Sequence, residues 1–133
     1  IIQALIIAHH KGVDIKLITP KSSDHLLADI GRSSYMRELY EIGADVVLYE
    51  GEMLHAKAIL FDDLGGMVGS VNFDNRSLFL NYEVVTFVYS PQFIESIEAW
   101  MNGLIDNSSR GMEKPSKFRE AVENIMKVFT PLL

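Results

Sequence analysis

Residues 54–81 read LHAKAILFDDLGGMVGSVNFDNRSLFLN, the most informative segment of the chain. Its apolar runs predict two short strands, over Leu54–Phe61 and around Met67–Ser70. The Asp-Asp-Leu-Gly-Gly segment between them consists largely of residue types that favour tight turns. The stretch is therefore predicted to fold as a hairpin.

Four polar side chains occur at a spacing of two along these predicted strands. His55 and Lys57 lie on the first strand, and Ser70 and Asn72 lie at the end of the second. Residues two positions apart on a strand leave the same face, so the hairpin would gather all four on one surface. Taken alone, His55 and Lys57 could also belong to an edge strand with a solvated polar face.

This set of side chains suits chemistry on a phosphodiester. A neutral histidine can attack phosphorus, and a lysine supplies a point charge for the non-bridging oxygens. Asparagine and serine add neutral donors that stabilise charge in the transition state. We expect no metal and no cofactor, because the histidines lack the spacing of a metal site; they are His9, His10, His25 and His55.

The rest of the chain alternates helical and strand patterns. The predicted helices are Ile2–His10, about Asp24 to near Gly43, Pro91 to about Leu104 and about Ser116–Phe129. The further predicted strands are Val13–Thr19, Asp45–Tyr49 and Tyr82–Tyr89, and Asn107–Gly111 is predicted as a linker. This order predicts an α/β fold: a mixed β-sheet sandwiched between helices, in a single domain over residues 1–133.

The amino-acid composition and net charge limit the classes of protein to which this chain can belong. The 133 residues are 48% apolar and 23% charged, which is typical of one folded domain. The absence of cysteine excludes a disulfide framework and a thiolate nucleophile. A net charge of -6 argues against nucleic acid as a partner, because an acidic chain repels phosphate backbones. No apolar run is long enough to span a bilayer, so we expect this chain to be soluble.

The spacing HxKxxxxD at residues 55–62, followed by GGMVGSVNFDNRS at residues 65–77, resembles the HKD signature of the phospholipase D superfamily. Three segments outside this signature make the resemblance more specific. RSSY at residues 32–35, NYE at residues 81–83 and the closing FTPLL resemble the C-terminal half of bacterial cardiolipin synthases. The resemblance covers essentially the whole chain and implies a phospholipase D-like fold.

The resemblance also implies roles for the polar side chains of the hairpin. His55 matches the HKD histidine, which serves as nucleophile or as general acid. Lys57 matches a catalytic and phosphate-binding lysine, and Asn72 matches a second phosphate-binding position. Ser70 matches the small hydroxyl beside the phosphate.

Two carboxylates complete the set of candidate catalytic residues. Asp62 matches the signature aspartate, whose implied role is more structural than chemical. Glu83 matches a carboxylate that hydrogen-bonds the histidine and holds its tautomer. Glu83 lies near the start of an otherwise apolar predicted strand, where an unpaired carboxylate would be costly. An exposed glutamate at a strand end is the alternative.

This chain departs from the family pattern in carrying one HKD motif. Family enzymes use two, one histidine attacking phosphorus and the other protonating the leaving alkoxide. His9, His10 and His25 are not followed by the rest of the motif. The chain also begins at Ile1, inside a predicted helix. We therefore expect a fragment of a longer two-motif protein, whose N-terminal half carries membrane segments and the first motif.

The function implied by the resemblance is that of a phosphatidyltransferase half-domain. It would form cardiolipin from two phosphatidylglycerol molecules through a phosphohistidine intermediate. The expected partners are phosphatidylglycerol or another phospholipid, the bacterial cell membrane through the parent protein, and the N-terminal HKD half. The isolated chain is expected to form a homodimer. The alternatives are a phospholipase D-type phosphodiesterase or nuclease active as a homodimer, and an inactive isolated half.

Overall fold

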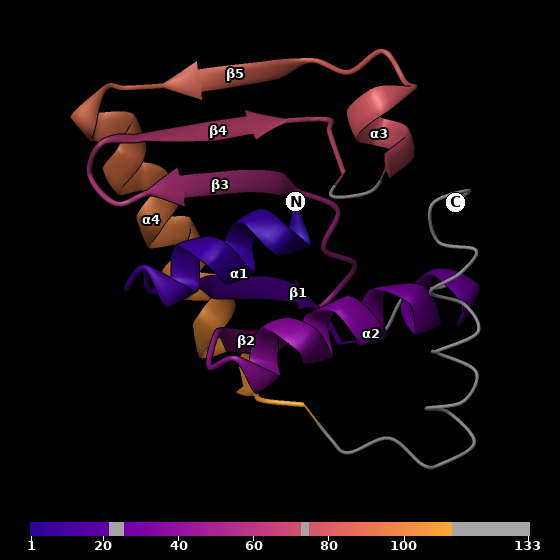
Figure 1. The fold of residues 1–133 in the computed structure, drawn as a ribbon. Helices are drawn as coiled ribbons and strands as arrows, with labels where there is room; N and C mark the ends of the chain where they lie inside the picture. Colours follow the sequence, from indigo (N-terminus) through magenta and orange to yellow (C-terminus); the bar gives the residue numbers. More distant parts are fainter. Residues whose placement is uncertain (22–25, 73–74, 113–133) are drawn as a thin grey trace.

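The computed structural model describes residues 1–21, 26–72 and 75–112 of the chain. Helices and strands alternate along these residues (Figure 1). In chain order they are α1 (Ile2–His10), β1 (Lys16–Pro20), α2 (Leu26–Glu41), β2 (Asp45–Tyr49), β3 (Lys57–Phe61), β4 (Gly65–Gly69), α3 (Asn75–Phe79), β5 (Val85–Val88), α4 (Pro91–Asp106) and β6 (Ser108–Arg110).

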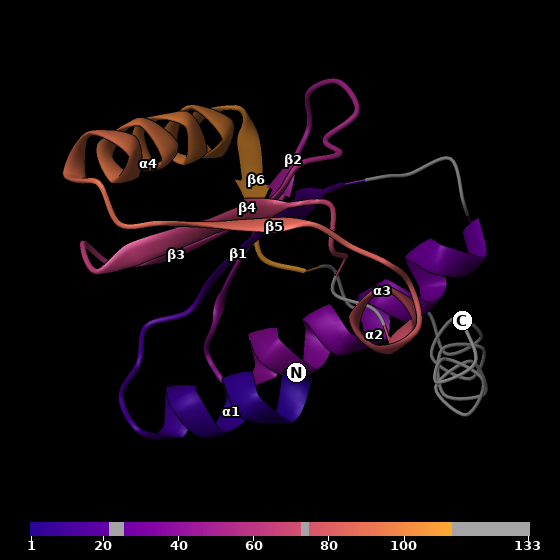
Figure 2. The ribbon, with the colours of Figure 1, turned by 90° about the horizontal axis from the view of Figure 1, so that it is seen from above.

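The described strands form two three-stranded sheets. The first has the order β1-β2-β6, with β1 parallel and β6 antiparallel to β2, and the second is the antiparallel sheet β3-β4-β5. Figure 2 shows α4 on one side of the strands and α1 and α2 on the other. The predicted α/β class with helices on both faces is confirmed, and the hydrogen bonding divides the expected mixed sheet into two.

The hydrophobic core centres on β2. Val46 and Val47 are both fully buried, although consecutive residues of a strand point to opposite faces. Both faces of β2 are therefore covered, which explains why its sequence is a continuous apolar run. Two helices, α2 and α4, contact β2 and provide this cover. Helix α2 contributes the buried side chain of Leu39.

Local sequence patterns predicted several elements at their observed bounds. Ile2–His10 and Asp45–Tyr49 form as α1 and β2, and α4 begins at Pro91, a position where the missing proline N–H costs nothing. Two elements were missed. The short helix α3 was not predicted, and Ser108–Arg110, predicted as part of a linker, pairs with β2 as strand β6.

Strand β6 is polar, so alternation of apolar residues could not identify it. Its pairing to β2 supplies the backbone hydrogen bonds, and an ion pair between Arg110 and Asp45, with a nitrogen–oxygen distance of 3.2 Å, joins the two strands at the surface. The predicted helix over Ser116–Phe129 and the predicted helix cap Asp24 lie outside the described residues.

Candidate active site

The candidate site lies at the end of the β3–β4 hairpin that is remote from its turn. Lys57 is the first residue of β3 and pairs with Gly69, the last residue of β4. His55 precedes β3 by two residues, and Ser70 directly follows β4. The predicted strand over Leu54–Phe61 was thus too long at its start, because β4 ends at Gly69 and offers no further partner residue to His55.

Lys57 is held against the main chain of His55. Its Nζ donates a hydrogen bond to the carbonyl oxygen of His55 at 2.7 Å. The Lys57 side chain is half-buried, whereas His55 is exposed. An ammonium group has three donors, so two remain for a ligand. The structure thus holds the Lys57 ammonium group against the main chain of the exposed His55.

Ser70 and Glu83 form a second pair at the same end of the hairpin. The Oγ of Ser70 donates to Oε2 of Glu83 at 2.5 Å and accepts a hydrogen bond from the backbone N–H of Val84 at 3.1 Å. The backbone N–H of Ser70 in turn donates to the carbonyl oxygen of Val84 at 3.0 Å. Three hydrogen bonds therefore fix Ser70 against the chain that leads into β5.

The close approach of these segments depends on Gly69. A Cβ atom at this position would clash with the backbone of Val84 and Val85, where the chain enters β5. Glycine therefore permits the contact that brings Ser70 to Glu83. This contact directs the proton of the Ser70 hydroxyl to a carboxylate, so the phosphate-binding role of Ser70 stays a prediction.

Glu83 does not lie on a strand, because β5 begins at Val85. It is half-buried, and its carboxylate is paired with Ser70. No hydrogen bond among the described residues joins Glu83 to His55, so the expected tautomer-holding contact also stays a prediction. Asn72 is exposed, and its phosphate-binding role is untested. Sequence spacing alone could not find the Ser70–Glu83 pair, which joins residues 13 positions apart.

Asp62 lies at the opposite end of β3, in the hairpin turn. Its φ of +51° is in the left-handed region, which aspartate tolerates better than most residues. The backbone N–H of Leu64 closes the turn by donating to the carbonyl oxygen of Phe61 at 3.0 Å. Asp62 is thus separated from His55 by the length of β3, and its structural role stays a prediction.

We expect Asp62→Ala to lower the free energy of unfolding by about 1 kcal/mol, because alanine resists the left-handed conformation. Asp62→Gly, which adopts that conformation freely, should retain the stability of the unmodified chain. Urea unfolding followed by circular dichroism measures both. Equal destabilisation by the two variants would mean that the carboxylate itself, and not the backbone conformation, makes Asp62 important.

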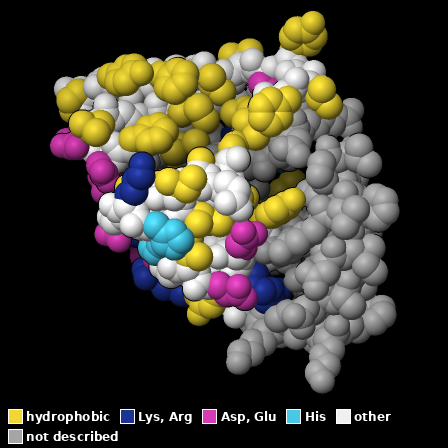
Figure 3. Space-filling view, in the orientation of Figure 1, with side chains coloured by type: hydrophobic (Ala, Val, Ile, Leu, Met, Phe, Trp, Pro, Cys, Tyr) yellow, Lys and Arg dark blue, Asp and Glu magenta, His cyan; other side chains and the backbone are white. Residues whose placement is uncertain are grey.

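One face of the β3-β4-β5 sheet is open and apolar. The register places the side chains of Lys57 and Val85, then Met67 and Phe87, on the face opposite α4. Hydrophobic side chains gather over these strands in Figure 3. We call this surface the open face; its exposed apolar residues are Phe61, Val85, Phe87 and Tyr89. Lys57 of the candidate site stands at one end of it.

The other histidines are not part of this cluster. His9, half-buried at the end of α1, has its Nδ1 3.2 Å from the carbonyl oxygen of Val13, and His10 is exposed in the last turn of the same helix. His25 lies outside the described residues. The described part of the chain holds no group of three or more side chains arranged to bind a metal ion. None of its described helices is long and apolar enough to cross a bilayer.

Comparison with known sequences identifies relatives over most of the chain. The family model described as "Cardiolipin synthase, PLD-like domain" matches residues 1–105. Cardiolipin synthase A of Klebsiella pneumoniae (strain 342) is 31% identical over 137 residues, covering 100% of this chain and 28% of the relative. Cardiolipin synthase of Listeria monocytogenes serotype 4a (strain HCC23) is 31% identical over 133 residues, covering 95% of this chain and 28% of the relative.

These relatives are much longer than this chain, which spans 28% of the length of each. Among solved structures, the phospholipase D family member Nuc from Salmonella typhimurium superimposes with a TM-score of 0.72 at 22% sequence identity. The match covers 84% of this chain and 73% of that chain. It confirms the predicted phospholipase D-like fold.

Proposed function

The chain belongs to the family of cardiolipin synthase PLD-like domains, and from that premise we propose that it is one HKD half of a phosphatidyltransferase. The reaction would convert two phosphatidylglycerol molecules into cardiolipin and glycerol. The observation that carries this proposal is the hairpin end where Lys57 lies against His55, beside the Ser70–Glu83 pair. A cation held against the main chain of an exposed histidine suits transfer of a group that carries a phosphate.

The proposed reaction is a double displacement. A neutral histidine attacks the phosphorus of the first lipid, and the bond from phosphorus to the glycerol headgroup oxygen breaks. A second histidine protonates that oxygen, and glycerol leaves. A terminal hydroxyl of the second phosphatidylglycerol then attacks the phosphohistidine, losing its proton to the second histidine and releasing the first. Water in place of the second lipid would yield phosphatidic acid.

Within this reaction His55 is one of the two histidines. Lys57, with two free donors, neutralises the non-bridging oxygens, whose charge increases in the transition state. Asn72 adds a neutral donor to the phosphate. Glu83, positioned by the hydroxyl of Ser70, orients and stabilises the imidazole ring of His55, as carboxylates do for catalytic histidines. Asp62 shapes the hairpin turn.

The second histidine must come from another HKD domain, because this chain carries one motif. We propose that its partner is the N-terminal half of a longer two-motif protein at the bacterial cell membrane. The open face suits this partner, since it is apolar and has Lys57 at its end. The lengths of the relatives leave room for a second such domain.

Without that half, a second copy of the chain should occupy the open face. We expect sedimentation velocity to show a dimer, and Phe87→Lys to shift the chain towards monomer, because a charge replaces a half-exposed aromatic ring on that face. Thr86→Lys is the matched control, since its side chain leaves the same strand on the opposite face. A monomer at high concentration, or equal effects of the two variants, would contradict docking through the open face.

The proposed function is tested with phosphatidylglycerol in mixed micelles. The complete natural protein and this chain are each assayed, and the products are identified by mass spectrometry. The complete protein should release glycerol and form cardiolipin. Activity of the chain by itself would show that a homodimer assembles a two-histidine site. Phosphatidic acid as the main product of the complete protein, or no lipid product at all, would overturn the assignment as a phosphatidyltransferase.

A further inference from the structure

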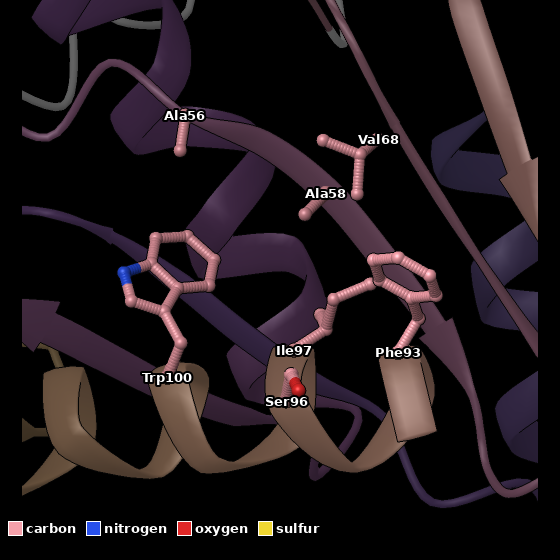
Figure 4. Close-up of a pocket in the computed structure, with 7 residues that line it drawn as sticks. All are labelled: Ala56, Ala58, Val68, Phe93, Ser96, Ile97 and Trp100. Carbon is pink, nitrogen blue, oxygen red and sulfur yellow. The ribbon is translucent and has the colours of Figure 1, made fainter. Parts of the chain in front are cut away.

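An apolar groove runs between α4 and the face of the β3-β4-β5 sheet that is turned away from the open face. Its volume is about 300 Å³, near the lower limit of sites that bind small ligands. Figure 4 shows the helix side chains pointing towards the two strands. The lining residues are Ala56, Ala58, Val68, Phe93, Ser96, Ile97 and Trp100.

The groove exists because small side chains on the sheet face large ones on the helix. Ala56 and Ala58 project at a spacing of two towards α4, and Val68 is the register partner of Ala58. A leucine in place of either alanine would fill part of the space. Phe93 and Trp100 remain partly exposed, with exposed fractions of 65% and 42%. The groove is thus lined with hydrophobic surface that reaches solvent.

The lining of the groove is almost entirely apolar, and the indole N–H of Trp100 is its one polar side-chain group without a hydrogen bond among the described residues. Ser96 is its one hydroxyl-bearing lining residue, and its Oγ donates a hydrogen bond to the backbone carbonyl of Gln92 at 2.7 Å. Burying an alkyl chain against such solvent-exposed apolar surface is favourable. A hydrocarbon chain matches this mainly apolar lining, whereas a headgroup or a nucleotide would lose its hydrogen bonds to water there.

One end of the groove adjoins the candidate active site. Ala56 lies between His55 and Lys57 in the chain, so its Cα is about 3.8 Å from the Cα of each. Ala56 lines the groove, while Lys57 stands on the opposite face of the sheet. An acyl chain of a lipid with its phosphate at His55 would therefore enter the groove by passing around the end of β3 at Ala56.

From this juxtaposition we propose that the groove binds one acyl chain of the phospholipid whose phosphate is bound at His55. The inference rests on the proposed function, which supplies the lipid. It adds to that function a site that distinguishes long-chain from short-chain substrates.

Trp100 makes the proposal directly testable, because it is the single tryptophan of the chain and lines the groove. The probe is ω-bromoundecanoate below its micelle concentration, whose bromine quenches indole fluorescence on contact. Quenching should saturate and be reversed by unbrominated undecanoate. Ala58→Leu should weaken the binding by about tenfold or more, because the added side chain occupies the space of several methylenes.

Two further variants complete the design. Ala99→Leu introduces the same side chain at an exposed position on α4 that does not line the groove, and should bind the probe like the unmodified chain. Phe93→Ala removes a large, half-exposed lining residue, so it should weaken binding even where Ala58→Leu fails to fold. Thermal melting by circular dichroism checks folding, and quenching by acrylamide checks that the indole is equally accessible.

The outcomes separate this inference from the proposed function. Quenching that does not saturate, or that is equal in the unmodified, Ala58→Leu and Phe93→Ala chains, would overturn the groove as an acyl site even if cardiolipin is formed. Saturable quenching sensitive to these variants supports the site. If the complete protein then forms no lipid product, the proposed function fails while a site for an alkyl chain remains.

Discussion

A His55→Ala variant of the complete natural protein should form cardiolipin at least about a thousandfold more slowly than the unmodified protein, because removing a covalent nucleophile or its acid–base partner removes one of the two displacement steps. The expected loss applies to the rate of turnover more than to lipid binding, since Lys57 and Asn72 are retained. Initial rates of cardiolipin formation, read by mass spectrometry, measure it.

The matched control is His10→Ala, which removes an exposed histidine from the last turn of α1. It should retain the unmodified rate. A phosphatidyl adduct on His55, detected in rapidly quenched digests, would identify His55 as the nucleophile of the pair. If His55→Ala retained a rate within a few-fold of the unmodified protein, the proposed mechanism would be wrong.

A Lys57→Met variant should lower the turnover rate by about a hundredfold or more, the typical cost of removing one donor that stabilises developing charge. Methionine keeps much of the length of the side chain and removes its charge. The variant also loses the hydrogen bond of 2.7 Å to the carbonyl oxygen of His55. Steady-state kinetics with phosphatidylglycerol measure the effect, and kcat should fall more than KM rises, because the oxygen charge is greatest in the transition state.

Lys16→Met is the control for this prediction. Lys16 is an exposed lysine at the start of β1, in the other sheet, and its loss changes the net charge equally. The control should leave kcat unchanged. Equal losses from Lys16→Met and Lys57→Met would show that net charge matters and that Lys57 has no local role at the phosphate.

The local sequence was sufficient to predict the β3–β4 hairpin, at whose end His55 and Lys57 lie, and several elements around it. The turn at Asp62 and the apolar runs on either side are encoded by neighbouring residues, so the hairpin could be predicted, although β3 begins later and β4 begins earlier than expected. The same holds for α1, whose apolar residues recur at helical spacing, and for β2, which is a short apolar run. His55 and Lys57 were identified by their spacing of two, shared with Ser70 and Asn72, and by the HxKxxxxD pattern to which they belong.

Only the tertiary structure fixed the bounds of the strands and the contacts between segments that are distant in the chain. β3 begins at Lys57 because β4 ends opposite it, and the polar β6 is a strand because β2 provides its partner. The Ser70–Glu83 hydrogen bond and the groove between Ala58 and Trp100 both join segments that are distant in the chain. Such contacts depend on packing between elements, which the pattern within any one element does not contain.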